Sequence, residues 1–322
     1  MHALIYFGQV GHHQVFESGL SRGRQRSAQY QLFVGISRLC QNGSAASCLR
    51  VADLFKLGYG CVDVMTRRVL TALASLESKF IVWPDAARRR VLSAVGEANY
   101  GFPGYCVNVD GTLLGLHRAP AFEMRPETYC HPRHRTYGFN TLLFADHFRY
   151  IVSYVFGWPG AAADSTIMAS SRIANEPDAF IKVGEEFIFA DLGFKRENYV
   201  ITPYKGEQAA PKHNQLFNKA QRVGRCRIEH VNGCLKARFA SLCAMPIDVK
   251  CKEDVNYCHE WVKGCIVLHN MLVWLGDEYD FVPPEEEEDA EFIRDDAANV
   301  SGKAMQNMVR DRWLRSKGWV QV

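Results

Sequence analysis

Long hydrophobic runs are missing from this 322-residue sequence. No stretch approaches the roughly 18 uncharged apolar residues that a membrane-spanning helix needs. The first residues, MHALIYFGQVGHH, also lack the basic start and apolar core of a secretory signal. The sequence therefore predicts a soluble, intracellular protein with no membrane segment.

The sequence also lacks an even number of cysteines that could all pair. The 11 cysteines are spread along the chain, which argues against a disulfide framework and favours reduced, mostly buried thiols. The run CHPRHR places Cys130, His131 and His134 as half of a possible metal site. No second pair follows at the spacing of zinc sites, so zinc binding is the weaker alternative here.

A large net charge is absent as well. The formal charge is only +3, so the total says little about partners. Hydrophobic residues make up 48% of the chain, which is ample for a large core, and the length suggests about two domains. No internal repeat is present.

The amino-terminal third has helical apolar spacing. Residues 30–40 and 48–57 predict two helices, and residues 60–73 a third one after a break at Leu57-Gly58-Tyr59. Three short helices with a glycine-bearing turn before the third are typical of a helix-turn-helix, in which Arg67 and Arg68 would face DNA. The alternative is a plain three-helix packing unit.

Strand patterns begin after a basic amphipathic helix. Five runs of apolar and β-branched residues predict strands, the second and third as a hairpin, and helical segments separate the later runs. The runs are residues 105–116, 137–148, 149–160, 185–194 and 198–204. Strands that alternate with helices after three consecutive strands predict a mixed sheet covered by helices.

Two of the predicted strands end on an aspartate. VNVD ends on Asp110 and FIFAD ends on Asp191. If the strands are neighbours, the two carboxylates lie side by side, and each raises the pKa of the other unless a positive charge sits between them. A divalent cation such as Mg²⁺, which takes oxygen ligands, would supply that charge.

A third acid stands alone in a basic helix. Residues 211–240 contain seven lysines and arginines, and Glu229 is the only acid among them. Arg225 lies four residues earlier, on the same helix face, and can orient the Glu229 carboxylate. By itself this pattern could be a plain ion pair. Together with the two aspartates it predicts a two-metal phosphoryl-transfer site.

The basic residues around Glu229 would hold a phosphate backbone without reading its sequence. The predicted DNA contacts of this helix are Arg222, Arg227, Lys236 and Arg238.

Seven stretches, in order, resemble the PIF/Harbinger-type transposases and the nucleases derived from them, in the DDE endonuclease superfamily. They are VNVDGT, GWPGAAADST, FIFADLGF, YVITPY, FN at Phe217-Asn218, RCRIEHVNGCLKARF and CIVLHNML. VADLFKLGYGCVDVMTRRVL also resembles the helix-turn-helix of that family.

The resemblance implies an RNase H-like α/β fold, a mixed sheet flanked by helices, with an all-helical module before it. It makes Asp110, Asp191 and Glu229 the catalytic, metal-binding acids of a Mg²⁺- or Mn²⁺-dependent two-metal site. Asp164, which follows Ala163 where the family has histidine, becomes either a helix cap or an accessory acid near the site, and Arg225 is a further accessory residue. The domains expected are a flexible arm (1–28), the helix-turn-helix module (29–85), the nuclease domain (86–275), and an acidic linker and tail (276–322).

The resemblance also implies DNA partners, namely terminal inverted repeats and a target, a Myb-like partner protein and a nuclear location; without it, the expectation is a cytoplasmic protein. Whether the chain forms a homo-oligomer stays open. We expect a DNA endonuclease and strand-transferase. The alternatives are a domesticated DNA-binding or scaffold protein that lost cleavage, and a small-molecule phosphohydrolase, against which the basic helix argues.

Overall fold

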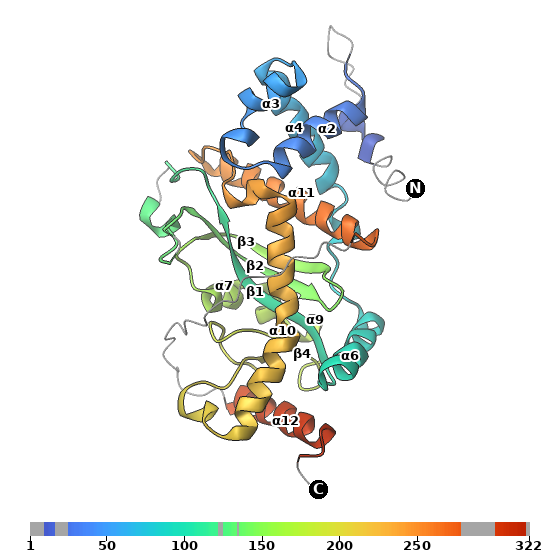
Figure 1. Cartoon of the computed structure of the whole chain (residues 1–322), viewed down its shortest axis with the longest axis vertical. Helices are drawn as coiled ribbons and strands as arrows, with labels where there is room; N and C mark the ends of the chain where they lie inside the picture. Colours follow the sequence, from blue (N-terminus) through green and yellow to red (C-terminus); the bar gives the residue numbers. More distant parts are fainter. Residues whose placement is uncertain (1–9, 17–24, 122–124, 134, 278–299, 320–322) are drawn as a thin grey trace.

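A five-stranded sheet forms the centre of the molecule in the computed structural model, which describes residues 10–16, 25–121, 125–133, 135–277 and 300–319 (Figure 1). The order across the sheet is β3-β2-β1-β4-β5. The strands are β1 (Tyr105–Gly115), β2 (Gly138–Asp146), β3 (Ile151–Pro159), β4 (Phe187–Phe189) and β5 (Val200–Ile201).

The sheet is mixed, as the sequence predicts. β1, β2 and β3 pair antiparallel as consecutive strands, whereas β4 pairs parallel to β1 and β5 parallel to β4. The chain between β3 and β4 contains three short helices, because a parallel partner needs a crossover connection. They are α7 (Asp164–Ser170), α8 (Arg172–Asn175) and α9 (Pro177–Phe180). This confirms a mixed α/β sheet flanked by helices, an arrangement compatible with an RNase H-like fold.

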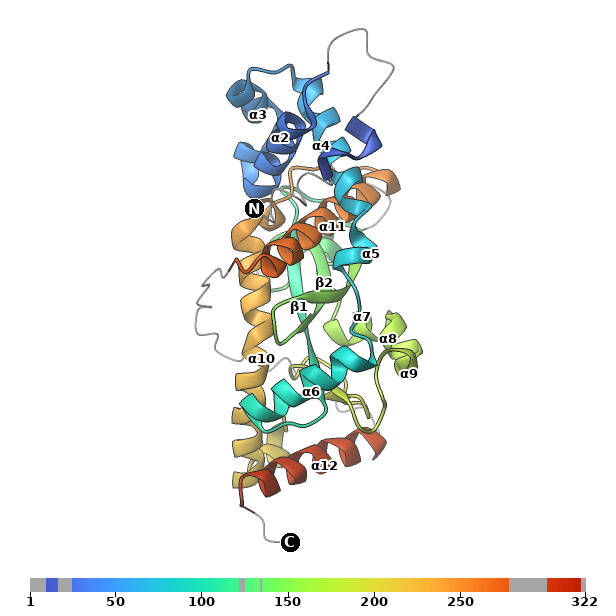
Figure 2. The same cartoon turned by 90° about the vertical axis from the view of Figure 1, so that its right-hand side faces the viewer.

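Helices cover both faces of the sheet. α10 (Lys212–Arg238) lies along one face, and α7 to α9 lie on the other side (Figure 2). α11 (Lys252–Trp274) packs against β3, while α6 (Ala86–Tyr100) packs against β1. α6 begins where the Asp85 side chain accepts a hydrogen bond from the Arg88 amide, and ends at Gly101, whose φ of 81° favours glycine.

The amino-terminal helices are where the sequence predicts them. They are α2 (Ala28–Cys40), α3 (Cys48–Phe55) and α4 (Tyr59–Ala74), followed by α5 (Glu77–Phe80). Val34, Val51 and Val62 are fully buried between α2, α3 and α4. α4 also packs on α11, where Gly264 leaves space for Leu70. Three packed helices are therefore confirmed, while their contact with DNA stays a prediction.

The two ends of the chain contribute to the core. Val10 and Phe16 belong to the predicted flexible arm, yet both are buried in the core cluster that contains α11. In the predicted tail, α12 (Val300–Ser316) packs Met305 and Trp313 against Phe102. Residues 1–9 and 17–24 of the predicted arm, and the acidic run at 278–299, lie outside the described residues.

Short 3₁₀ helices complete the described elements: η1 (Gln14–Phe16), η2 (Gly43–Ala46), η3 (Pro126–Tyr129), η4 (Gly206–Ala209) and η5 (Ala240–Cys243). Within the part of the chain that the structure describes, no helix has the length and apolar character needed to cross a membrane.

Candidate active site

Strand register brings Asp110 and Asp191 side by side. Asn108 of β1 pairs with Phe189 of β4 in parallel, and each aspartate follows its paired residue by two positions. The prediction that Asp110 ends its strand is wrong. β1 continues to Gly115 because it stays paired with β2, where Asp110 lies opposite Leu143. Only β4, the parallel partner of β1, ends before this point. Asp110 therefore lies beside Asp191 where β1 has lost its neighbour on that side.

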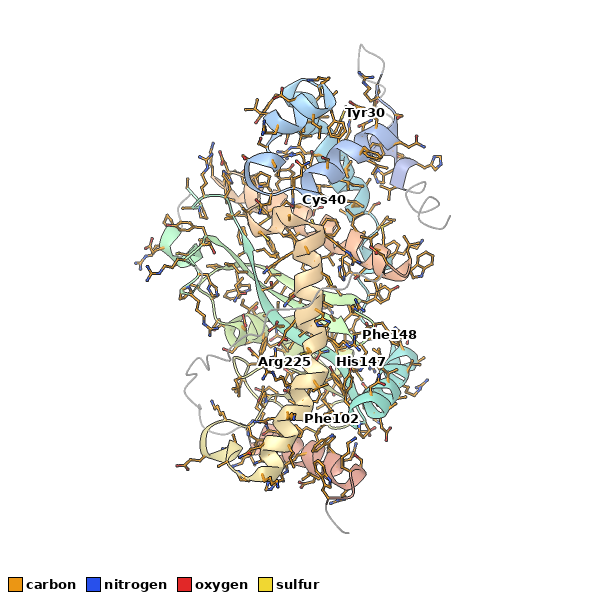
Figure 3. The ribbon with its side chains drawn as sticks, viewed as in Figure 1. Tyr30, Cys40, Phe102, His147, Phe148 and Arg225 are labelled. Carbon is orange, nitrogen blue, oxygen red and sulfur yellow. The ribbon has the colours of Figure 1, made fainter. Side chains whose placement is uncertain are left out.

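α10 adds polar side chains to the same place. Arg225 lies in the middle of this helix (Figure 3), and its Nη2 is 2.7 Å from Oε1 of Glu229. One turn further on, Asn232 Nδ2 donates a hydrogen bond of 2.9 Å to Asp110 Oδ2. The spacing 225, 229, 232 places all three on one face of the helix. Gly224 lets the helix approach β1, where its carbonyl accepts a hydrogen bond from the Tyr105 hydroxyl at 2.9 Å.

The charges in this cluster are unevenly balanced. Burial raises the pKa of the Asp110 carboxyl well above its usual range, and the nearby negative charge of Asp191 raises it further. Arg225 lowers that pKa, whereas Asp164 and Glu229 raise it. The charges of three other carboxyl groups thus act on Asp110, while the Arg225 guanidinium lowers its pKa. We call these four residues with Arg225 the acid cluster.

The turn after β4 holds the Asp191 side chain. Gly193 donates its amide hydrogen to Asp191 Oδ1 at 2.8 Å, an Asx-type turn. A β-carbon at position 193 would lie 3.1 Å from that oxygen, so the turn favours glycine. Gln221 of α10 holds the strand end by donating to the Ala190 carbonyl at 2.9 Å. These contacts orient Asp191 from both the turn and the helix.

Asp164 approaches β1 from the other face of the sheet. Successive residues of a strand face opposite sides, so Gly111 faces α7 while Asp110 faces α10. A β-carbon at Gly111 would lie 2.3 Å from both Asp164 carboxylate oxygens, so only glycine admits Asp164 here. Asn140 of β2 donates to Asp164 Oδ1 at 2.7 Å. This placement favours the accessory role over direct membership in the triad.

The donor types of the acid cluster suit a hard divalent cation. Carboxylate oxygens are the ligands that Mg²⁺ and Mn²⁺ prefer, and Asp191 raises the pKa of the buried Asp110 carboxyl beyond what burial alone does. Among the described residues, however, no three histidine, cysteine or acidic side chains are arranged closely enough to hold a metal ion as they stand. Glu229, engaged with Arg225, would have to turn toward the aspartates.

The weaker zinc alternative gains no support. Cys130 and His131 directly follow the end of η3, and His134 lies outside the described residues. The described part of the chain contains no metal-binding group that includes them.

The predicted DNA contacts of α10 differ in exposure. Arg222 is exposed, and Lys236 is partly exposed. Arg227 is also partly exposed, with its Nε donating to the Tyr100 hydroxyl at 3.2 Å. The Arg238 side chain is only 8% exposed and donates to the Asp277 carbonyl at 2.8 Å. This burial favours a structural role for Arg238, so we leave it out of the proposed interface.

The two arginines of α4 that were predicted to contact DNA interact with other parts of the protein. Arg67 Nε is 2.8 Å from Asp63 Oδ2, and its guanidinium lies 4.0 Å from the centre of the Tyr257 ring in α11. Arg68 Nη1 donates to Gln31 Oε1 at 3.1 Å. Arg67 keeps half of its surface in solvent, so it can still meet a phosphate.

The sequence prediction missed two asparagines. Asn140 interrupts the apolar run FNTLLFA, and a buried amide in such a run is costly unless it has partners, which is a signal that could have been used. Asn232 gave no signal of this kind. The Asn232 Oδ1 atom is buried without a hydrogen-bond partner in the described part of the chain. The hydrogen bond that its side chain makes there is the donation from Nδ2 to Asp110.

A family comparison agrees with this geometry. A model of the DDE superfamily endonuclease family matches residues 109–270, which is half of the chain and contains every member of the acid cluster. The protein belongs to the DDE superfamily endonucleases, and the resemblance stated from the sequence is confirmed.

Two relatives come from Arabidopsis thaliana. The chain is 22% identical over 270 residues to the protein called Antagonist of Like Heterochromatin Protein 1, covering 79% of this chain and 65% of that protein. It is 21% identical over 270 residues to a protein called ALP1-like, with 80% and 64% covered. The chain thus spans a little under two thirds of the length of these relatives. No solved structure matches.

Proposed function

We propose that the protein is a divalent-metal-dependent DNA endonuclease and strand-transferase. Asp110, Asp191 and Glu229 hold the Mg²⁺ or Mn²⁺ ions. The observation that carries this proposal is the strand register that sets Asp110 beside Asp191, next to the face of α10 that carries Glu229 and the Asn232 bonded to Asp110. Evolution of a soluble fold disfavours such crowding unless a function needs it.

Each residue of the cluster has its own task in this proposal. Bound ions would activate water or a 3′ hydroxyl and stabilise the leaving oxygen. Asn232 keeps Asp110 turned toward α10 through its hydrogen bond. Arg225 holds Glu229 in an ion pair, from which Glu229 would turn toward a bound metal ion. Asp164 adds negative charge from the far side of β1 and strengthens the attraction for cations.

The proposed substrate is DNA, with terminal inverted repeats and a target as its two forms. The contacts we propose are phosphate contacts by Arg67, Arg68, Arg222, Arg227 and Lys236. In this scheme residues 29–85 act as a DNA-binding module and residues 86–275 as the nuclease domain. A Myb-like partner belongs to the same proposal. So does a nuclear location, which the heterochromatin-related name of one relative supports.

Glu229→Gln tests the proposal. Supercoiled plasmid is incubated with the full chain in Mg²⁺ or Mn²⁺, and binding is measured separately in Ca²⁺. Removing a metal ligand should slow nicking by at least about a hundredfold, equivalent to about 2.7 kcal/mol. DNA binding should be unchanged or tighter, since a negative charge near phosphate is lost.

The matched control is Glu176→Gln. Glu176 also pairs with an arginine four residues away, Arg172, but lies outside the acid cluster. This variant should nick at the wild-type rate. Normal nicking by Glu229→Gln would reduce Glu229 to an ion-pair partner of Arg225. A wild type that never nicks with any metal would favour the non-catalytic scaffold.

A further inference from the structure

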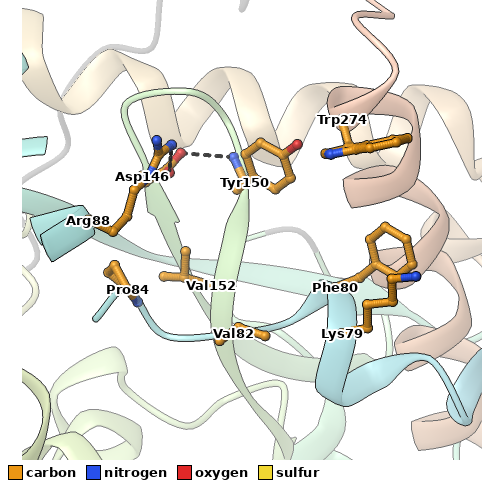
Figure 4. A pocket seen from close by; sticks show the side chains of 9 residues that line it. All are labelled: Lys79, Phe80, Val82, Pro84, Arg88, Asp146, Tyr150, Val152 and Trp274. Atoms are coloured by element: carbon orange, nitrogen blue, oxygen red, sulfur yellow. Dashed lines mark hydrogen bonds and ion pairs between the residues drawn. The ribbon is translucent and has the colours of Figure 1, made fainter. Parts of the chain in front are cut away.

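A pocket outside the acid cluster lies between α5, the β2–β3 turn and the end of α11. Its volume is about 240 Å³, and none of its lining residues belongs to the acid cluster (Figure 4). The lining residues are Lys79, Phe80, Val82, Pro84, Arg88, Asp146, Tyr150, Val152 and Trp274. We call it the α5–α11 pocket.

The walls of the α5–α11 pocket are mainly apolar and open to solvent. Trp274 is 47% exposed and Val82 is 52% exposed. Phe148 of the adjoining β2–β3 turn is exposed too, with the Arg88 guanidinium 4.6 Å from the centre of its ring. Exposed apolar side chains are ordinary when scattered, but gathered around a concavity they mark an interaction site.

Asp146, the one acid among the residues that line the pocket, accepts hydrogen bonds through both of its carboxylate oxygens. Asp146 Oδ1 accepts hydrogen bonds from the amides of Phe148 at 2.8 Å and Tyr150 at 3.1 Å. Its Oδ2 accepts one from Arg88 Nη2 at 3.2 Å. Two cations, Arg88 and Lys79, lie toward opposite sides of the pocket (Figure 4). Lys79 and Arg88 together outnumber Asp146, so the lining carries a net positive charge, which favours a negatively charged group beside whatever fills the pocket.

The volume limits the occupant. Sites for small molecules usually measure about 300–1,000 Å³, so this pocket suits a single large side chain. A nucleobase would bury polar edge groups against mainly apolar walls, which costs free energy unless each group finds a partner. An aromatic side chain has at most one polar group to satisfy and is the usual anchor of a protein interface.

We propose that the α5–α11 pocket binds a short acidic segment of a partner protein. One aromatic side chain of that segment fills the pocket between Trp274, Tyr150 and Val82. Carboxylates next to it in sequence meet Lys79 and Arg88. The pocket and the acid cluster share no residue, so this binding is independent of cleavage.

Two labelled peptides test the proposal by fluorescence polarisation with the full chain. Gly-Asp-Trp-Glu-Gly should bind at least about tenfold more tightly than Gly-Lys-Trp-Lys-Gly, because the rim is cationic. Trp274→Ala and Val82→Glu should each weaken the acidic peptide at least about tenfold. Lys79→Glu should reduce the preference for the acidic peptide.

The matched control is Trp319→Ala, which truncates another exposed tryptophan that packs edge-on against Trp313. It should bind the acidic peptide like wild type. Circular dichroism confirms that Trp274→Ala and Val82→Glu are folded, and both should keep the wild-type plasmid-binding affinity. Equal binding of the two peptides, or an unchanged affinity in both pocket variants, would overturn the proposal. So would a thymidine oligonucleotide that binds wild type but not Trp274→Ala.

Discussion

The acid cluster and the amino-terminal helices use charge in opposite ways. In the acid cluster, carboxyl groups outnumber the cations that act on them, and the pKa of Asp110 is raised, first by burial and then by the charge of Asp191. In the amino-terminal helices each buried cation has partners. The buried Arg38 donates to the Ala46 carbonyl at 3.0 Å and to the Thr66 hydroxyl at 3.1 Å, and the half-exposed Arg67 also pairs with Asp63.

The difference separates charge used for function from charge used for packing. A buried cation with satisfied hydrogen bonds holds elements together and costs little further free energy. Crowded carboxylates do the opposite, since they weaken the fold unless a ligand neutralises them. Unmatched charge is therefore the better guide to the active site, and the predictions below test that distinction.

The largest effect on stability is expected from Arg238→Ala. Its side chain is buried between α10 and the end of α11, where Nη1 lies 3.3 Å from Nδ1 of His269 and Nη2 lies 3.1 Å from Asp277 Oδ2. Because Asp277 is half exposed, the loss is moderated by solvent, and we expect about 2 kcal/mol of unfolding free energy. Urea unfolding measures it.

The control for Arg238→Ala is Arg222→Ala, whose exposed side chain should cost less than about 0.5 kcal/mol. If Arg238→Ala were as stable as wild type and bound DNA less well, Arg238 would return to the DNA interface as the sequence predicts.

Asp110→Asn should stabilise the metal-free protein, by about 1 kcal/mol. The substitution removes a crowded charge, and the asparagine oxygen can still accept from Asn232. The sign follows from the raised pKa of the folded state. The wild type loses stability as pH rises from about 4 through that pKa, so the gain should be present at pH 7 and vanish near pH 4.

Thermal unfolding in a chelator at both pH values checks this prediction. Asp178→Asn, on exposed α9, is the control and should not change stability. A lower unfolding temperature for Asp110→Asn at pH 7 would mean that the Asp110 charge is well compensated in the folded protein.

The smallest effect is expected on DNA affinity. Arg222→Ala should weaken duplex binding a few-fold and lower the slope of log affinity against log salt by about one, because one phosphate contact is lost. Arg67→Ala should lower the slope likewise if α4 meets DNA. An unchanged slope with reduced stability would instead assign Arg67 to packing on Tyr257.

Most of the secondary structure could be predicted from the sequence. α4 and α10 follow their apolar spacing and differ from the predicted ranges by one or two residues at each end. The prediction that Asp110 ends its strand was wrong, because only β4 stops near Asp110 while β1 stays paired with β2, and the sequence does not show which neighbour of β1 stops first. The wrong strand end did not change the predicted site, because the strand register still brings Asp110 beside Asp191.

The parts that the sequence did not reveal depend on contacts between distant segments. Asn232 is an ordinary helix residue until β1 places Asp110 opposite it, 122 positions away. Arg238 fits a basic DNA-binding face by composition, yet the end of α11 covers it. The packing of α12 on Phe102 was hidden for the same reason. Composition predicts which side chains carry charge, and only the fold decides which of them find partners.

Manganese binding tests the central claim, that the acid cluster is a divalent-cation site, without needing a DNA substrate. Mn²⁺ is titrated into the chelator-treated full chain, and free Mn²⁺ is measured by electron paramagnetic resonance. We expect Asp110→Asn and Asp191→Asn each to weaken binding at least about tenfold, while Asp178→Asn binds as wild type does. Equal Mn²⁺ binding by wild type, Asp110→Asn and Asp191→Asn would contradict the account.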